Sequence, residues 1–391
     1  MNDYDAIVIG AGPAGSSLAL HLAAQGRSCA LIDGATFPRS KVCGEGIMPH
    51  GLHALQELGI EPEGAPFVGL RYLLEDGTRA ASRFPQGLGG LGVQRSELDA
   101  ELVRRCQAEP RIDVRLGAWA RAVHLPSAPG ERASVELGDA RLTAPVLVAA
   151  DGCRSRIRRQ AGLEAPLLGA ARFGVGAHFA HAPRADPMVE VFLGSGYELY
   201  STPVSAELTC VALLTYREGL ARLQGDLEGG LRELLAASAG RAQFLADAPL
   251  AGGPVRGIGP LAVQSTRAHA EGLLLVGDAA GGLDPITGEG VSLALVTSKV
   301  ASEVLAGAYA RNDFSARRLA AWTRQRRRAV RGLQRFTQGL LYLSRNHAKA
   351  ERIVRTLAEK PDTFERLLAV AAGTSSLGSL RLRDGYRLLV A

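Results

Sequence analysis

Three glycines near the N-terminus have the spacing of a phosphate-binding turn. Gly10, Gly12 and Gly15 stand in the run Gly-Ala-Gly-Pro-Ala-Gly, between a short apolar segment and a stretch of small helix-forming residues. The first glycine permits a tight turn, the second lets a pyrophosphate approach the backbone, and the third lets helix and strand pack closely. Free N–H groups at the start of the helix would bind the phosphates. The pattern predicts a dinucleotide site.

An acidic residue completes this pattern. Asp33 directly follows the apolar run Ser28–Ile32, so it is predicted at the tip of the next strand. A carboxylate at this position accepts a hydrogen bond from a ribose hydroxyl, and its charge disfavours a 2′-phosphate. We therefore expect that the bound nucleotide is not NADP.

The elements that position these residues follow from hydrophobic periodicity. Tyr4–Ile9 and Ser28–Ile32 are short apolar runs rich in β-branched residues, and Ala14–Ala24 between them is helical in pattern. A further apolar strand is predicted at Leu273–Val276, followed by a helix over Gly288–Gly307. This order is typical of a parallel, doubly wound sheet, which is a Rossmann-like α/β fold.

Between the two parts of that sheet the pattern changes. Residues 170–216 alternate between apolar and polar side chains in several runs, which predicts a mostly antiparallel sheet. A discontinuous cofactor domain with an inserted substrate domain explains this order. The predicted division is a cofactor-binding domain of residues 1–165 and 250–310, a β-sheet substrate domain of residues 166–249 to which the hairpin of residues 67–90 is a candidate addition, and a helical C-terminal region of residues 311–391.

Two more strand-ending turns carry acids. Asp278 follows Gly277 after the strand Leu273–Val276, and Asp151 precedes Gly152 after another apolar run. A carboxylate at a strand tip can bind several hydroxyls of a ribose or a ribityl chain. Each turn alone is common, but their order after a glycine-rich turn is specific.

In this order the motifs resemble the flavoprotein superfamily of para-hydroxybenzoate hydroxylase-type monooxygenases, geranylgeranyl reductases and flavin-dependent halogenases. The resemblance covers roughly residues 1–310 and includes Arg95 in Val-Gln-Arg-Ser-Glu-Leu-Asp. It implies a glutathione-reductase-type FAD domain, a bound FAD, and NAD(P)H as a transient donor without a second Rossmann domain. The predicted cofactor-binding residues are Gly10, Gly12, Pro13, Ala14, Gly15, Asp33, Arg39, Lys41, Cys43, Gly44, Arg95, Asp151, Gly152, Gly277, Asp278, Pro285, Gly288, Gly290 and Val291.

The reactive end of the flavin is predicted to lie against residues Asp284–Gly290. Gly288 and Gly290 open a helix whose first N–H groups would point at the N1 and C2-carbonyl edge of the ring and stabilise a reduced, anionic flavin. Pro285 restricts the loop and has no N–H to compete. These three residues are therefore catalytic candidates. Glu289 is expected to face away from the anion and to be structural.

The segment Phe37–Pro49 supplies a fourth catalytic candidate. Its Lys-Val-Cys-Gly run resembles the geranylgeranyl reductases, in which a cysteine lies beside the flavin, and its Gly-Glu pair resembles the halogenases. Cys43 is thus predicted to face the substrate side of the ring, with a small packed loop residue as an equal alternative. A reactive thiol needs an electropositive site. Arg39 and Lys41 would supply one, unless they bind phosphate.

Three activities fit the superfamily. A halogenase needs a Trp-x-Trp-x-Ile-Pro block, and the corresponding run Glu198–Pro203 contains no tryptophan, so halogenation ranks last. The reductase motif Tyr-x-Trp-x-Phe-Pro is only half kept, as Tyr-Ser-Thr-Pro. We therefore favour a monooxygenase that uses O2 and a flavin C4a-hydroperoxide to hydroxylate or epoxidise a small aromatic, polyketide or isoprenoid molecule. Reduction of carbon–carbon double bonds is the alternative.

Three tyrosines on the predicted antiparallel sheet are candidates to line a substrate pocket. They are Tyr197, Tyr200 and Tyr216, and packing in the core or on the surface is the alternative for each. His178, in a strand-like run, is expected to be structural rather than a base. No metal site is predicted, because the five cysteines are scattered without a Cys-x-x-Cys spacing.

The positive charge of the chain is local. Nine arginines and one acid lie in residues 311–335, which leaves 36 basic against 38 acidic residues elsewhere. Such a run is typical of a solvated helix face, so we expect no nucleic acid; a peripheral membrane contact, or a flavin-binding interaction protein that docks an acidic partner, is the alternative. The acidic start, the lack of ~18 uninterrupted apolar residues and the scattered cysteines predict a cytoplasmic protein.

Overall fold

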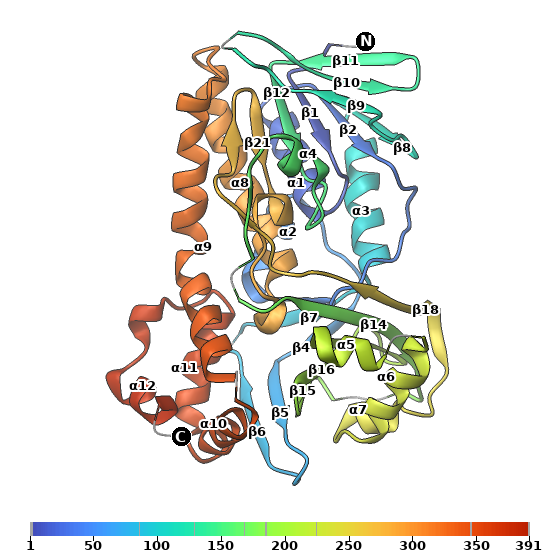
Figure 1. The fold of residues 1–391 in the computed structure, drawn as a ribbon, viewed down its shortest axis with the longest axis vertical. Coiled ribbons are helices and arrows are strands. Elements are labelled where there is room, and N and C mark those ends of the chain that lie inside the picture. The colour runs from blue at the N-terminus through green and yellow to red at the C-terminus, as the bar shows by residue number, and fades with distance from the viewer. Residues whose placement is uncertain are drawn as a thin grey trace.

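The computed structural model describes residues 3–389 apart from positions 86, 129, 168, 184–185, 224 and 345. The chain forms an α/β half and a β-sheet half, and the long helix α9 (Ala316–Ser344) runs down one outer edge past both (Figure 1). The predicted fold class, a Rossmann-like domain with a mostly antiparallel second sheet and a helical C-terminal region, is confirmed.

A six-stranded sheet forms the centre of the first half. Its order is β20-β21-β12-β1-β2-β8, and only the β20–β21 pair is antiparallel. The four inner strands, β21, β12, β1 and β2, are largely apolar and buried because helices pack against the sheet. The bounds are β1 (Ala6–Ile9), β2 (Cys29–Asp33), β8 (Ile112–Leu116), β12 (Val146–Ala149), β20 (His269–Ala270), β21 (Leu273–Leu275), α1 (Pro13–Ala24), α3 (Arg95–Gln107) and α8 (Gly290–Tyr309).

Helix α8 begins at Gly290, two residues later than predicted, because Gly288 adopts a left-handed conformation that ends the preceding 3-10 turn. Among the described residues it is the one helix long and apolar enough to cross a membrane. Most of its apolar window is buried, and it packs against α1, α2 (Pro49–Glu57) and α9. This is the environment of a core helix.

A seven-stranded sheet, in the order β18-β14-β17-β16-β15-β5-β6, forms the second half. Its neighbours are antiparallel except for β5 and β15, which are parallel. The predicted hairpin of residues 67–90 is present as β5 and β6 and belongs to this sheet. The bounds are β5 (Gly69–Leu73), β6 (Arg79–Arg83), β14 (Arg172–Ala180), β15 (Met188–Gly194), β16 (Tyr197–Pro203), β17 (Leu208–Tyr216) and β18 (Leu250–Ile258).

Strand β18 corrects one predicted boundary. The sequence assigned residues from 250 onward to the cofactor domain, but Leu250–Ile258 pairs with β14 at the edge of the substrate sheet. Its glycine-rich sequence lacks the apolar alternation of its neighbours, because this edge strand is largely exposed. The substrate sheet therefore extends to Ile258.

Alternating side chains of the seven-stranded sheet enter two different cores. Phe192 and Leu199 pack with the short helices α5 (Arg217–Arg222), α6 (Leu227–Ala236) and α7 (Arg241–Phe244). Side chains of the opposite face, including Val189, pack with helices of the C-terminal region. These are α10 (His347–Glu359), α11 (Pro361–Ala371) and α12 (Leu382–Leu389).

Helix α9 contributes to both halves. Near its start the buried Trp322 donates its indole N–H to the carbonyl oxygen of Leu275, at 2.8 Å. Near its end Phe336 enters the core shared with α10 and α11. The remaining elements are β3 (Gly46–Ile47), β4 (Ala65–Phe67), β7 (Gly90–Gly92), β9 (Ala122–His124), β10 (Ala133–Leu137), β11 (Ala140–Ala144), α4 (Arg156–Gln160), β13 (Glu164–Ala165), β19 (Gln264–Ser265) and the 3-10 turns η1 (Gly277–Ala280), η2 (Pro285–Thr287) and η3 (Leu377–Ser379).

Candidate functional site

The glycine-rich turn joins β1 to α1, and the helix and the strand pack closely there. A Cβ on Gly15 would lie 1.8 Å from the carbonyl oxygen of Gly10, so a side chain would force the helix away from the strand. Gly10 itself has a φ of +107°, which favours glycine. A Cβ on Gly12 would meet only the Arg39 guanidinium, at 3.6 Å, among the described atoms within 4 Å. Gly12 therefore faces open space at the start of α1, where phosphates are expected to bind.

Asp33 is oriented beside this turn by backbone donors. Its Oδ2 accepts from the N–H of Ala11 at 2.8 Å, and its Oδ1 accepts from the N–H of Ala35 at 2.8 Å. Arg39 lies 3.9 Å from Asp33 and 3.4 Å from the buried Asp99. The carboxylate predicted to bind a ribose is thus fixed at the strand tip by local bonds.

The three predicted turns converge on one cavity of about 320 Å³. Gly12, Gly152 and Gly277 all line it, together with Asp278. Lys41 also lines it, and its Nζ lies 3.5 Å from where a Cβ on Gly152 would be. The juxtaposition arises because β1, β12 and β21 are neighbours in the sheet and end at the same edge.

Asp151 lies behind this cavity rather than in its wall. Its Oδ2 accepts from the N–H of Arg156 at 2.8 Å, at the start of α4. Its Oδ1 is buried without a hydrogen-bond partner among the described residues. The carboxylate therefore positions the turn that carries Gly152, and the direct cofactor contact predicted for Asp151 stays a prediction.

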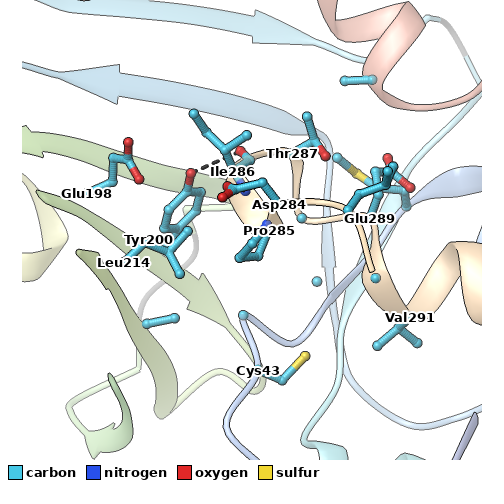
Figure 2. A pocket seen from close by; sticks show the side chains of 18 of the residues that line it. Cys43, Glu198, Tyr200, Leu214, Asp284, Pro285, Ile286, Thr287, Glu289 and Val291 are labelled. Atoms are coloured by element: carbon cyan, nitrogen blue, oxygen red, sulfur yellow. Dashed lines mark hydrogen bonds between the residues drawn. The ribbon is translucent and has the colours of Figure 1, made fainter. Parts of the chain in front are cut away.

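The loop from η2 to α8 forms another wall, and Figure 2 shows Pro285, Glu289 and Val291 along it. No described atom lies within 4 Å of where a Cβ on Gly288 or Gly290 would be. The Oγ1 of Thr287 is buried without a partner among the described residues. The space beside Gly288 and Gly290 is thus open to a ligand, and the hydroxyl of Thr287 in η2 has no described partner there.

Cys43 lies across the open space from Pro285 (Figure 2). Its Sγ accepts from the N–H of Glu45 at 3.4 Å. The thiol also contacts the guanidinium of Arg95, whose charge is paired with Asp99 at 2.9 Å. Cys43 therefore borders the cavity near Arg95, a cation whose charge is already balanced by Asp99. The electropositive setting expected from Arg39 and Lys41 stays a prediction.

Glu45 forms a buried contact that sequence reasoning missed. It is 3% exposed and lines the cavity. Its Oε1 accepts from the N–H of Arg95 at 2.8 Å, and its Oε2 lies 2.6 Å from Nε2 of His178. His178, expected to be structural, thus bonds to a carboxylate at the cavity wall. Glu45 directly follows the Cys-Gly pair, so there was a reason in the sequence to consider it. Its partner His178 lies on β14 in the other half of the molecule, and the sequence alone did not connect the two.

Beyond Cys43 the cavity continues into an apolar chamber. We use this name for the space between the seven-stranded sheet and helices α9–α11. Burial raises the pKa of the chamber residue Tyr72 to about 12, so its phenol stays neutral. The chamber lining includes Tyr72, Val191, Leu193, Phe336, Leu357 and Leu368.

A buried ionic triad lies where the chamber meets the η2 loop. Arg172 pairs with Glu198 and with Asp284, the latter at 3.0 Å. Burial raises the pKa of both carboxyl groups, and the guanidinium partly opposes that rise. Asp284 also accepts from the N–H of Ile286 at 3.0 Å, so the triad fixes the loop in place.

Glu289 pairs with His50 beneath the start of α8. The two side chains approach to 3.1 Å between Oε2 and Nε2, and Glu289 is 1% exposed. His50 Nδ1 lies 2.8 Å from the carbonyl oxygen of Ala372, which links α8 to the end of α11. Burial raises the pKa of Glu289. Burial lowers the pKa of His50, but its bonds to Glu289 and Ala372 outweigh this effect and raise it overall.

The three predicted substrate tyrosines have three different positions. Tyr200 lines the cavity and donates its hydroxyl to the carbonyl oxygen of Ile286 at 2.9 Å, as Figure 2 shows. Tyr197 packs on Phe192 in the opposite core, because residues three apart on a strand point to opposite faces. Tyr216 ends β17 beside Arg172 and lines a separate cavity of about 450 Å³. Only Tyr200 is therefore at the predicted pocket.

The residues that line the cavity suit the chemical groups of an extended dinucleotide such as FAD. The predicted cofactor residues Pro13, Ala14, Gly44 and Val291 line it as well. A Cβ on Gly44 would meet no described atom within 4 Å. Glycines along the wall let a cofactor approach the backbone closely. The unpartnered Thr287 hydroxyl is available to form a hydrogen bond with it.

Comparison with known sequences agrees with this geometry. Residues 3–195 match the FAD binding domain family. The chain is 31% identical over 333 residues to digeranylgeranylglycerophospholipid reductase 1 of Methanopyrus kandleri, which covers 80% of this chain and 83% of that protein. It is 29% identical over 335 residues to menaquinone reductase of Mycobacterium tuberculosis, covering 77% and 76% of the two chains.

Two solved structures share the fold. A geranylgeranyl bacteriochlorophyll reductase-like protein of Thermoplasma acidophilum has a TM-score of 0.74 at 20% identity, covering 100% of this chain and 96% of that one. PqsL, a probable FAD-dependent monooxygenase of Pseudomonas aeruginosa, has a TM-score of 0.74 at 20% identity, covering 90% and 99%. The equal scores mean that the fold alone does not distinguish a reductase from a monooxygenase.

Proposed function

The chain belongs to the FAD-dependent oxidoreductase family that contains the geranylgeranyl reductases, and from this premise we propose that it saturates carbon–carbon double bonds of an isoprenoid lipid. The observation that carries the proposal is the apolar chamber, which continues the cofactor cavity between the second sheet and α9–α11. A long hydrocarbon chain is the substrate that such a lining favours. The relatives named as reductases support the same choice.

Hydroxylation or epoxidation, which the sequence favoured, stays a prediction. A monooxygenase for a small aromatic molecule needs a closed pocket around one ring. The chamber instead extends from Cys43 to residues of α11 such as Leu368. This elongated lining is the reason to prefer reduction of a chain.

Saturation of a double bond adds a hydride to one carbon and a proton to the other. When bound, FAD supplies the hydride chemistry, held by the turns at Gly12, Gly152 and Gly277 and by the start of α8. NADH or NADPH is proposed as the reductant. It would bind only transiently, because the described residues contain no second glycine-rich strand–turn–helix unit to hold it. The chain itself must supply the proton.

We assign the proton to the pair of Glu45 and His178. A proton shared between Oε2 and Nε2 across 2.6 Å is held at the cavity wall, one residue beyond Gly44. The side chain of His178 is 19% exposed, whereas that of Glu45 is 3% exposed. The histidine can therefore be reprotonated from solvent while the acid faces the pocket. Tyr200 and Tyr72 are poorer donors, because burial raises the pKa of both phenols.

The proposal is tested without oxygen. The purified protein with FAD and NADPH is incubated with a geranylgeranyl lipid in detergent, and products are analysed by mass spectrometry. We expect a gain of two hydrogens per reduced bond, with deuterium from heavy water at one carbon. Products that carry labelled oxygen in aerated reactions, and no anaerobic reduction, would mean that the enzyme is a monooxygenase.

Substitutions of Glu45 and His178 test whether this pair donates the proton. Glu45→Gln and His178→Gln are expected to retain FAD and to lower kcat at least about a hundred-fold, which is the usual contribution of a positioned acid. His181→Gln is the matched control, because His181 directly follows the same strand but bonds to Thr209, at 2.8 Å. If all three variants have similar turnover, the pair does not deliver the proton.

A further inference from the structure

Helix α9 presents a row of arginines on its outer face. Arg317, Arg324, Arg328, Arg331 and Arg335 are all exposed, and we call them the arginine stripe. At 100° per residue they lie within about 60° of one another around the helix, and they extend over about 27 Å. Figure 1 shows α9 as a long, straight helix at the outer edge of the molecule.

The stripe has no counter-charge on its own helix. Residues Ala316–Ser344 include no aspartate or glutamate. Among the described residues no stripe arginine forms an ion pair within 4 Å, although Asp313, just before the helix, interacts electrostatically with Arg317. By contrast, Arg318, Arg326 and Arg327 all donate to backbone carbonyl groups of the cofactor half. Structural arginines on α9 are therefore bonded inward, and the stripe remains available to an external anion.

Two neighbouring features indicate which anion. Tyr342 lies on the same helix face, two turns beyond Arg335, and is 64% exposed. Phe336 lies about 80° to 140° around the helix from the stripe arginines, and Leu340 lies about 120° to 180° from them. Both line the apolar chamber on the inward side of α9. The stripe and the chamber therefore lie on different sides of the same helix, about one helix diameter, or ~10 Å, apart. Cations beside an exposed tyrosine are typical of a lipid headgroup interface.

We propose that the arginine stripe binds the enzyme along α9 to membranes that contain anionic phospholipid. The guanidinium groups would contact headgroup phosphates, and Tyr342 would lie at the headgroup level. The choice of a membrane over nucleic acid rests in part on the proposed function, since an isoprenoid lipid is delivered from a bilayer. The electrostatics of the stripe do not depend on the reaction.

Vesicle sedimentation tests the proposal without any turnover. The FAD-loaded protein is mixed with phosphatidylcholine vesicles, or with vesicles in which about a third of the lipid is phosphatidylglycerol. We expect binding only to the anionic vesicles, and release at ~0.5 M salt, where charges are screened over a few ångströms. Replacement of Arg324, Arg328 and Arg331 by glutamine should weaken the partition coefficient about a hundred-fold.

A matched triple variant controls for total charge. Arg104, Arg105 and Arg111 are exposed on or beside α3, and their replacement by glutamine removes the same charge elsewhere. This control should bind vesicles as the unaltered protein does. The proposal is overturned by equal loss in both triple variants, by equal binding to neutral vesicles, or by a duplex DNA oligomer that binds the stripe more tightly than the anionic vesicles do.

The two proposals fail separately. If the stripe variant loses vesicle binding but still reduces a lipid presented in detergent, both stand. If the unaltered protein binds anionic vesicles but reduces no isoprenoid, only the proposed function fails. If it reduces the lipid in detergent without binding anionic vesicles, only the docking surface fails.

Discussion

The cavity has one half lined mainly by backbone and another lined by side chains. Around Gly12 and Gly290 the wall consists of glycines and helix starts, and the positions of atoms there are fixed by the sheet behind them. Around Leu368 the wall consists of apolar side chains from a sheet and three helices. A backbone wall recognises one charged group at one place, whereas a side-chain wall selects by volume and apolarity.

This difference teaches where changes should be sharp and where they should be graded. In the backbone half a single Cβ occupies the space of a phosphate. In the chamber a larger residue shortens the space but leaves other contacts in place. We therefore expect substitutions in the backbone half to cause loss of the cofactor. Substitutions in the chamber are expected to change the preferred length of the substrate chain.

The largest effect is expected in the backbone half. Gly12→Val should abolish FAD retention while the fold persists, because its side chain would occupy open space rather than clash with the protein. Flavin absorbance per chain measures FAD retention, and far-ultraviolet circular dichroism measures whether the fold persists. Gly332→Val on α9 is the control, since a Cβ there meets no described atom within 4 Å. A yellow, fully loaded Gly12→Val protein would contradict the site.

A graded effect is expected in the chamber. Ala371→Phe should lower kcat/KM for a geranylgeranyl substrate about ten-fold and for a geranyl substrate far less, because only the longer chain needs the space near α11. FAD content should not change. Ala369→Phe, buried on the same helix but not lining the cavity, controls for the cost of overpacking. Equal losses for both substrates would mean that α11 does not limit chain length.

A smaller effect is expected where the two halves meet. Tyr200→Phe removes the donor to the Ile286 carbonyl and should lower the free energy of unfolding by about 1 kcal/mol. Chemical denaturation measures this change. Tyr197→Phe is the matched control on the same strand, and it should differ little because Tyr197 faces the other core. If Tyr197→Phe lowered the unfolding free energy more than Tyr200→Phe does, the assignment of these two side chains to opposite faces of β16 would be wrong.

The smallest effect is a pH dependence beneath α8. The pKa values of His50 and Glu289 are both raised in the folded chain. The folded state thus binds more protons, so the stability that these groups contribute is complete below their ordinary pKa values and is lost as pH rises through the raised ones. The unfolding free energy should therefore fall as the pH rises above the ordinary pKa values of 4.5 for Glu289 and 6.5 for His50. Glu289→Gln combined with His50→Gln should reduce this slope, and an unchanged slope would exclude the pair as its source.

Local patterns predicted much of the backbone half. Gly10, Gly12 and Gly15 imply their turn because the constraint acts within six residues, and Asp33 follows from the end of an apolar strand. Asp151 shows the limit of this reasoning. Its motif was identified, but the carboxylate of such a turn can face a cofactor or accept from the N–H of Arg156 five residues later, and the residue types do not decide between these orientations.

The sequence by itself determined the order of strands and turns, because glycine conformations, strand periodicity and acidic strand ends are short-range properties. The tertiary structure alone decided that β14 brings His178 to Glu45, that Tyr200 rather than Tyr197 faces the pocket, and that α9–α11 close the chamber. These outcomes depend on pairing and packing between segments more than eighty residues apart. The free energy that favours each arrangement comes from contacts between distant segments, and a local sequence pattern does not predict such contacts.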